Sequence, residues 1–111
     1  MKSTVRNLFS ACLIMGAAVV LTTGAWAADA AAGKALYATK CKTCHGADGV
    51  PPASLAKALG PNLKPMNDAS VQGHSDGELK DAILKGKGKM KPQSVSAGEA
   101  DNLVAAIRTM K

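Results

Sequence analysis

Cys41-Lys42-Thr43-Cys44-His45 is the most informative segment of this 111-residue chain. It places two cysteines three residues apart and a histidine directly after the second cysteine. Residues 29–40, just before it, are rich in alanine and predict a helix. Residues 46–52, just after it, are rich in glycine and proline and predict a loop. The motif therefore lies where a first helix gives way to a loop.

In an exported protein, a C-x-x-C-H motif predicts covalent attachment of a c-type haem. Two thiols at this spacing can each bond one vinyl group of the porphyrin, and the adjacent imidazole can point at the iron. A redox dithiol normally lies between a strand and a helix, and no strand is predicted before Cys41. Structural zinc needs about four ligands, and the set of Cys41, Cys44, His45 and His74 contains an awkward adjacent pair. The motif therefore favours haem over a dithiol or a zinc site.

The N-terminal segment predicts export. Lys2 and Arg6 precede an apolar stretch from Leu8 to Leu21, and the small-residue pattern Ala25-Trp26-Ala27 follows. These features are typical of a secretory signal peptide. The strongly apolar part has about 14 residues, fewer than the roughly 20 that span a bilayer, so an uncleaved anchor is less favoured. We therefore expect residues 1–27 to be a cleaved signal peptide and 28–111 a single periplasmic domain without stable membrane insertion.

The composition of residues 28–111 indicates a thin hydrophobic core. These 84 residues contain 12 basic and 8 acidic side chains, for a net charge of +4, and Tyr37 is their only aromatic residue. So few aromatic residues argue against a nucleic-acid surface built on stacked rings. Ile, Leu, Val and Phe supply only 13 of the 84 residues, below the share of roughly 20% at which disorder is expected. A domain this small and this poor in core residues needs a further stabilising element, and the predicted haem would be that element.

Two capping boxes predict the later helices. Ser75 with Glu78, and Ser96 with Glu99, have the S-x-x-E form, and apolar residues follow each at helical spacing. Gly86 is expected to end the first of these helices. The apolar stripe of the last helix comprises Ala100, Leu103, Val104, Ile107 and Met110.

The middle of the chain is expected to be mostly loop. Ser54 to Leu59 predicts a short helix stopped by Gly60 and Pro61, and residues 61–74 predict a loop. No segment shows the alternation typical of strands. The sequence thus predicts an all-α domain of three to four short helices joined by long loops, and loops this long in a small domain are usually functional.

The chain resembles the class I c-type cytochromes, of the small soluble bacterial monohaem kind, over nearly all of residues 30–111. The resemblance rests on Gly33 and Tyr37, on residues 41–46, on Gly60-Pro61-Asn62-Leu63, on the Gly/Lys loop with Met90, and on the closing amphipathic helix. It implies the cytochrome c fold around one haem c attached through Cys41 and Cys44. It also implies a close crossing of the first and last helices at Gly33, with Tyr37 packed against Leu103 or Ile107.

The resemblance further implies the groups that contact the haem. His45 is the expected proximal iron ligand and Met90 the distal one. The Pro61 carbonyl is expected to accept a hydrogen bond from the proximal histidine, and Leu63 to pack on the haem. From the residues alone, Met90 is a candidate because it lies in a flexible Gly-Lys loop far along the chain. Met66 and His74 remain alternatives to it on those grounds.

These expectations favour an electron carrier over an enzyme. His/Met ligation leaves no open coordination site, so the protein would shuttle single electrons between periplasmic redox partners, as a monomer. Lysines of the Met90 loop are expected to surround the haem edge and to steer acidic partner proteins onto it; they are Lys85, Lys87, Lys89 and Lys91. The alternative is a haem enzyme or gas sensor with a labile sixth ligand, because Lys91 stands where the family usually has a proline.

Overall fold

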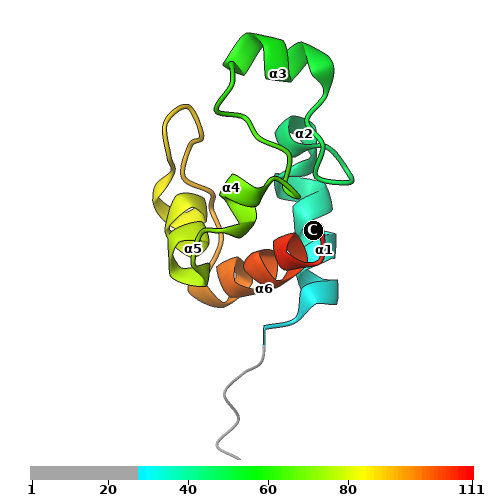
Figure 1. Ribbon diagram of the computed structural model, residues 1–111. Helices are drawn as coiled ribbons and strands as arrows, with labels where there is room; N and C mark the ends of the chain where they lie inside the picture. Colours follow the sequence, from blue (N-terminus) through cyan, green and yellow to red (C-terminus); the bar gives the residue numbers. More distant parts are fainter. Residues whose placement is uncertain (1–27) are drawn as a thin grey trace, which may run out of the picture.

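The computed structural model describes residues 28–111, so the predicted signal peptide of residues 1–27 lies outside the described part. The described residues form six helices (Figure 1): α1 (Ala30–Lys40), α2 (Lys42–His45), α3 (Ala53–Leu59), α4 (Ala69–Gln72), α5 (Asp76–Lys85) and α6 (Ala97–Arg108). Within residues 28–111 the only β-type pairing is an isolated bridge between Lys87 and Met90. The all-α prediction is confirmed.

Helices α1 and α6 cross in close contact at Gly33, as the sequence predicts. A Cβ atom at this position would lie 1.8 Å from the backbone oxygen of Asn102 and 3.1 Å from the Cβ of Ala106. The start of α1 is also fastened to α6, because the N–H of Asp29 donates to Oδ1 of Asn102 at 2.8 Å. The carboxylate of Asp29 caps α1 by accepting from the amides of Ala31 and Ala32. The first and last helices are therefore held together at a contact that only glycine fits.

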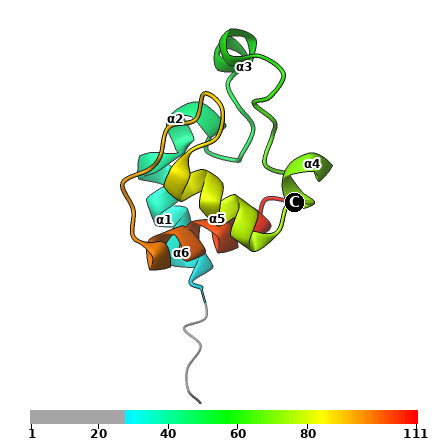
Figure 2. The same ribbon diagram turned by 90° about the vertical axis from the view of Figure 1, so that its left-hand side faces the viewer.

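Both predicted capping boxes form. The amide of Glu78 donates to Oγ of Ser75 at 3.1 Å, and that of Glu99 donates to Oγ of Ser96 at the same distance. Helix α5 ends at Gly86, again as predicted. Helices α5 and α6 pack together (Figure 2), and their apolar faces join α1 and two other segments in one core. Its buried members are Tyr37, Cys41, Met66, Leu79, Ile83, Ala100, Leu103, Val104 and Ile107.

The prediction of a continuous loop over residues 61–74 is wrong at α4. The side chain of Asp68 begins this helix by accepting from the amide of Ser70 at 2.8 Å. Pro61 and Pro65 both precede Asp68, so neither ring blocks the helical turn that follows.

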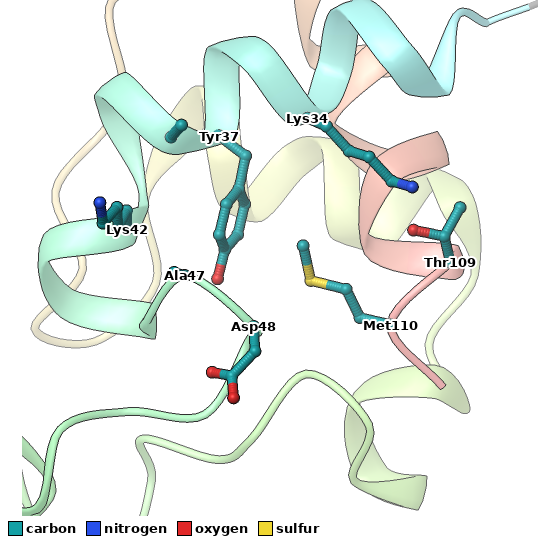
Figure 3. A pocket seen from close by; sticks show the side chains of 8 residues that line it. Lys34, Tyr37, Lys42, Ala47, Asp48, Thr109 and Met110 are labelled. Carbon is teal, nitrogen blue, oxygen red and sulfur yellow. The ribbon is translucent and has the colours of Figure 1, made fainter.

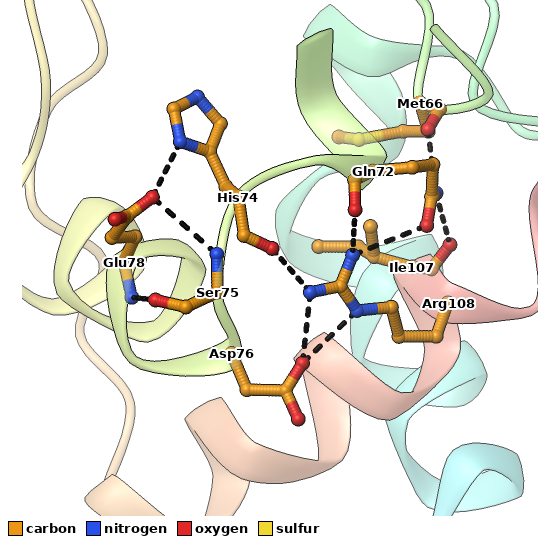
Figure 4. A network of polar contacts seen from close by, with 8 residues as sticks. All are labelled: Met66, Gln72, His74, Ser75, Asp76, Glu78, Ile107 and Arg108. Carbon is orange, nitrogen blue, oxygen red and sulfur yellow. Dashed lines mark hydrogen bonds and ion pairs between the residues drawn. The ribbon is translucent and has the colours of Figure 1, made fainter. Parts of the chain in front are cut away.

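Arg108 of α6 fastens the connection between α4 and α5 (Figure 4). Its guanidinium donates to the carbonyl oxygens of Gln72 and His74 and to the carboxylate of Asp76. The Gln72 side chain in turn donates to the backbone oxygens of Met66 and Ile107, at 2.7 and 3.1 Å. Apart from the bond to Met66, these contacts join residues that lie more than thirty positions apart along the chain.

Helix α3 lies apart from the core. It has no buried residue, and both views place it at the opposite end of the molecule from α6 (Figures 1 and 2). Its extent agrees with the helix predicted at residues 54–59, and Gly60 ends it in a left-handed conformation with φ of 84°. Among residues 28–111, no helix is both long and apolar enough to cross a membrane.

Candidate haem-binding site

The C-x-x-C-H segment forms a single turn of helix directly after α1. The amides of Cys44 and His45 both donate to the carbonyl of Cys41, at 3.2 and 2.9 Å. Both thiols are free, and they differ in environment because Cys41 is buried in the core whereas Cys44 is exposed. Burial, with a smaller contribution from the neighbouring Cys44, raises the pKa of the Cys41 thiol. The turn thus presents one thiol to the interior and one to the surface.

The imidazole of His45 has the properties of a metal ligand. It is half-buried, and burial lowers its pKa, so the ring is neutral at pH 7. A neutral ring is the form that binds metals. Among residues 28–111, its buried Nδ1 finds no hydrogen-bond partner, which is uncommon in proteins. Two free thiols and a neutral imidazole within one turn fit the donor set that a covalently bound haem c requires.

The hydrogen bond from His45 to Pro61 that the resemblance implies is not formed. Nδ1 of His45 has no partner, and Pro61 is an exposed residue in the turn that follows α3. That turn belongs to the segment that lies apart from the core, so no packing brings its carbonyl to the ring. Leu63, two residues further on, is half-buried. Haem contacts of Pro61 and Leu63 therefore stay predictions.

Tyr37 fastens the motif to α1. Its hydroxyl donates to the carbonyl of Gly46 at 2.7 Å, and only 2% of the residue is exposed. Burial, followed by the nearby Cys41 and Asp48, raises the pKa of Tyr37 to about 12, so the hydroxyl keeps its proton. The sequence predicts Tyr37 as a packing residue against α6 and gives no sign of this hydrogen bond, since nothing in the spacing of residues 37 and 46 marks it.

Met90 lies in a tight turn rather than in the flexible loop that its Gly/Lys surroundings predict. Lys87 and Met90 exchange two backbone hydrogen bonds of 3.0 Å, and the amide of Gln93 donates to the carbonyl of Ile83 at 2.8 Å. The turn is thereby fastened to the end of α5. Met90 is half-buried, and the lysines on either side of it are exposed.

The two alternative distal ligands are engaged elsewhere. Met66 is 8% exposed and belongs to the core, and its amide donates to the carbonyl of Gly49 at 2.8 Å. Nδ1 of His74 contacts Oε2 of Glu78 at 2.6 Å on the surface (Figure 4). These contacts favour Met90 over both.

A surface hollow of about 430 Å³ lies beside Tyr37 (Figure 3). It is bordered by Lys34, Tyr37, Ala38, Lys42, Ala47, Asp48, Thr109 and Met110. None of the predicted haem attachment residues or iron ligands lines it, so this hollow is distinct from the predicted haem contacts.

A single-domain helical fold with C-x-x-C-H at the end of its first helix defines the class of c-type cytochromes. The chain belongs to this class through the family described as cytochrome c oxidase, cbb3-type, subunit III, whose model matches residues 28–107. Members of the cytochrome c family carry out haem-based electron transfer.

Two relatives agree with this assignment. Cytochrome c-555 of Chlorobaculum tepidum is 35% identical over 72 residues, which cover 60% of this chain and 67% of that protein. The solved structure of the KustC0563 c-type cytochrome matches with a TM-score of 0.61 and 32% identity, covering 71% of this chain and 96% of that one. The resemblance to small c-type cytochromes is therefore confirmed.

Proposed function

We propose that this protein is a periplasmic carrier of single electrons with one haem c, attached through Cys41 and Cys44 and ligated by His45 and Met90. The observation that carries the proposal is the turn of residues 41–45, which holds two free thiols beside a half-buried imidazole. When bound, the haem supplies a reversible one-electron change at iron. The chain has to supply ligands, hold them in place and keep water from the iron.

The side chains divide these tasks. His45 presents a neutral ring, and Tyr37 fixes the end of the turn that bears it. A thioether from Met90 favours the reduced iron and raises the reduction potential relative to ligation by two histidines. With His45 and Met90 both bound to it, the iron would have no open position for a substrate or gas, which favours electron transfer over a haem enzyme or gas sensor.

The Met90→Ala variant is expected to lose the weak red absorption band of methionine-ligated ferric haem, whereas the wild-type protein shows it. Removal of the thioether leaves the iron without its sulfur ligand, and the band depends on that bond. The measurement is an optical spectrum of the oxidised protein after periplasmic expression.

Met66→Leu is the matched control, because it keeps the volume of a buried methionine while removing its sulfur. This variant is expected to retain the band. If the wild type lacks the band, or binds carbon monoxide readily, the sixth position is open and the sensor or enzyme alternative is favoured.

The distribution of surface charge supports the hypothesis that acidic redox proteins bind this domain. Each of the eight acidic side chains in residues 28–111 accepts an internal hydrogen bond or pairs with a basic side chain. Among the described residues, Lys85 pairs with Asp81 at 3.5 Å, whereas Lys87, Lys89 and Lys91 have no acidic side chain within 4.0 Å. We propose that the positive charge of the Met90 turn steers acidic proteins to this edge.

Replacing Lys87, Lys89 and Lys91 together by glutamine is expected to slow oxidation by ferricyanide by about tenfold at low ionic strength. The wild-type rate should fall as salt is added, and the variant's rate should depend on salt much less. Stopped-flow kinetics across a salt series measure both effects. The control variant replaces Lys34, Lys40 and Lys111 by glutamine, which changes the net charge by the same amount at other positions. Local steering is refuted if this control slows the reaction as much as the test variant does. It is also refuted if the wild-type rate does not change with salt.

A further inference from the structure

The turn that bears Met90 folds back onto Gly86, at the end of α5. A Cβ atom at Gly86 would lie 2.6 Å from the backbone oxygen of Met90. It would also lie 2.9 Å from Cδ and 3.0 Å from the backbone nitrogen of Pro92. A side chain at Gly86 would therefore collide with the backbone of Met90 and with Pro92.

The backbone at Gly86 gives a second and independent reason for glycine. Its φ of 78° and ψ of 166° lie in a region that is essentially restricted to glycine. No other residue can enter this conformation without strain, so a side chain at Gly86 would have to alter both the turn and its contact with Met90.

Hydrogen bonds within the turn and to α5 hold the backbone of Met90 in place. Two hydrogen bonds join Lys87 to Met90, and a third joins Gln93 to Ile83 in α5. The backbone of Met90 is thus held between a short turn on one side and the end of a helix on the other. Because this turn is held at both ends, we expect a shift of the backbone at Gly86 to move Met90 as well.

We propose that Gly86 is a positioning residue that sets where the Met90 thioether lies relative to the iron. The proposal rests on the proposed function, because it takes Met90 as the distal ligand. An added methyl group at Gly86 pushes the Met90 carbonyl and Pro92 away from α5 and weakens the iron–sulfur bond. The strain corresponds to a loss of roughly tenfold or more in the equilibrium constant for methionine ligation.

Gly88 offers a matched control within the same turn. It also has a positive φ, of 57°, but a Cβ atom there would meet nothing within 4 Å. Gly86→Ala and Gly88→Ala therefore make the same chemical change in the same turn, and only the first places a methyl group against Met90.

The test compares wild type, Gly86→Ala, Gly88→Ala and Met90→Ala as haem-loaded proteins. Two signals are measured: the red band of the ferric haem and the dissociation constant for added imidazole, which competes with the methionine for iron. Gly86→Ala should weaken the band and bind imidazole roughly tenfold tighter or more, because a weakened internal ligand competes less. Gly88→Ala should stay within about threefold of wild type, and Met90→Ala sets the upper limit of affinity.

The outcomes that overturn the inference are distinct from those that overturn the proposed function. If Gly86→Ala matches wild type, or if Gly88→Ala changes as much as Gly86→Ala, the contact with Met90 does not set the ligand. If Gly86→Ala loses the far-ultraviolet helical signal, Gly86 is required for folding and is not a positioning residue. A wild type without the red band, or a Met90→Ala variant that keeps it, refutes methionine ligation and the role of Gly86 together.

Discussion

The chain without haem, prepared as the Cys41→Ala/Cys44→Ala variant, is expected to be largely unfolded and to show no cooperative thermal transition. The buried core has only nine members, of which Tyr37 is the single aromatic residue, and α3 buries no residue at all. Ordering each residue costs about 1–2 kcal/mol of backbone entropy alone. A domain of this size with so little apolar surface to bury does not offset that cost without a covalently held group.

Far-ultraviolet circular dichroism during heating measures this prediction, with the haem-loaded wild type as reference. Because Cys41 is itself a core residue, the reduced wild-type chain without haem is the necessary control, and it should be unfolded as well. A cooperative transition in the double variant would show that the protein core suffices. If the reduced wild-type chain without haem showed a transition and the double variant did not, the variant would fail to fold because it lacks the buried sulfur of Cys41.

Replacing Gly33 by alanine is expected to lower the melting temperature of the haem-loaded protein by about 12–24 °C. The new Cβ would lie 1.8 Å from the Asn102 oxygen and 2.5 Å from its carbonyl carbon, so α1 and α6 must separate. Overpacking of this kind costs about 3 kcal/mol, and each kcal/mol shifts the melting temperature by about 4–8 °C in a domain of this size. Differential scanning calorimetry gives the shift directly.

Gly98 is the matched control for this substitution. It lies in the first turn of α6, and a Cβ atom there would meet nothing within 4 Å. Gly98→Ala should stabilise the protein by about 0.5–1 kcal/mol, since alanine is the better helix former. Similar melting temperatures for the two variants would mean that the helices do not need glycine at their crossing.

Much of the fold follows from local sequence signals. The two capping boxes, the stop of α5 at Gly86 and the short helix before Gly60 all depend on residues within a few positions of one another. Local hydrogen bonds fix such features whatever the rest of the chain does. The attachment motif is equally local, since its two thiols and its imidazole lie within five consecutive residues.

The sequence predicted other features of the structure less well. The hydrogen bond implied between His45 and Pro61 does not form, and α4 appears in a segment expected to be loop. Nothing in the sequence around Arg108 indicates that its guanidinium donates to the backbone carbonyls of Gln72 and His74. The contacts of Arg108 depend on where a distant segment lies, and spacing along one segment carries no such information. Helix α4, by contrast, begins at a local cap, the side chain of Asp68, which the prediction overlooked.

The sequence by itself determined the helical class, the two capped helices and the C-x-x-C-H turn, because helix caps and a five-residue motif are set by neighbouring residues. Only the tertiary structure decided that Met66 belongs to the core, that Tyr37 fastens Gly46, and that the Met90 turn rests on Gly86. The place of Met66 depends on packing between segments that lie far apart along the chain, which meet only when the whole chain closes around its core. The other two contacts span nine and four residues, and they depend on how a turn folds back onto the preceding helix.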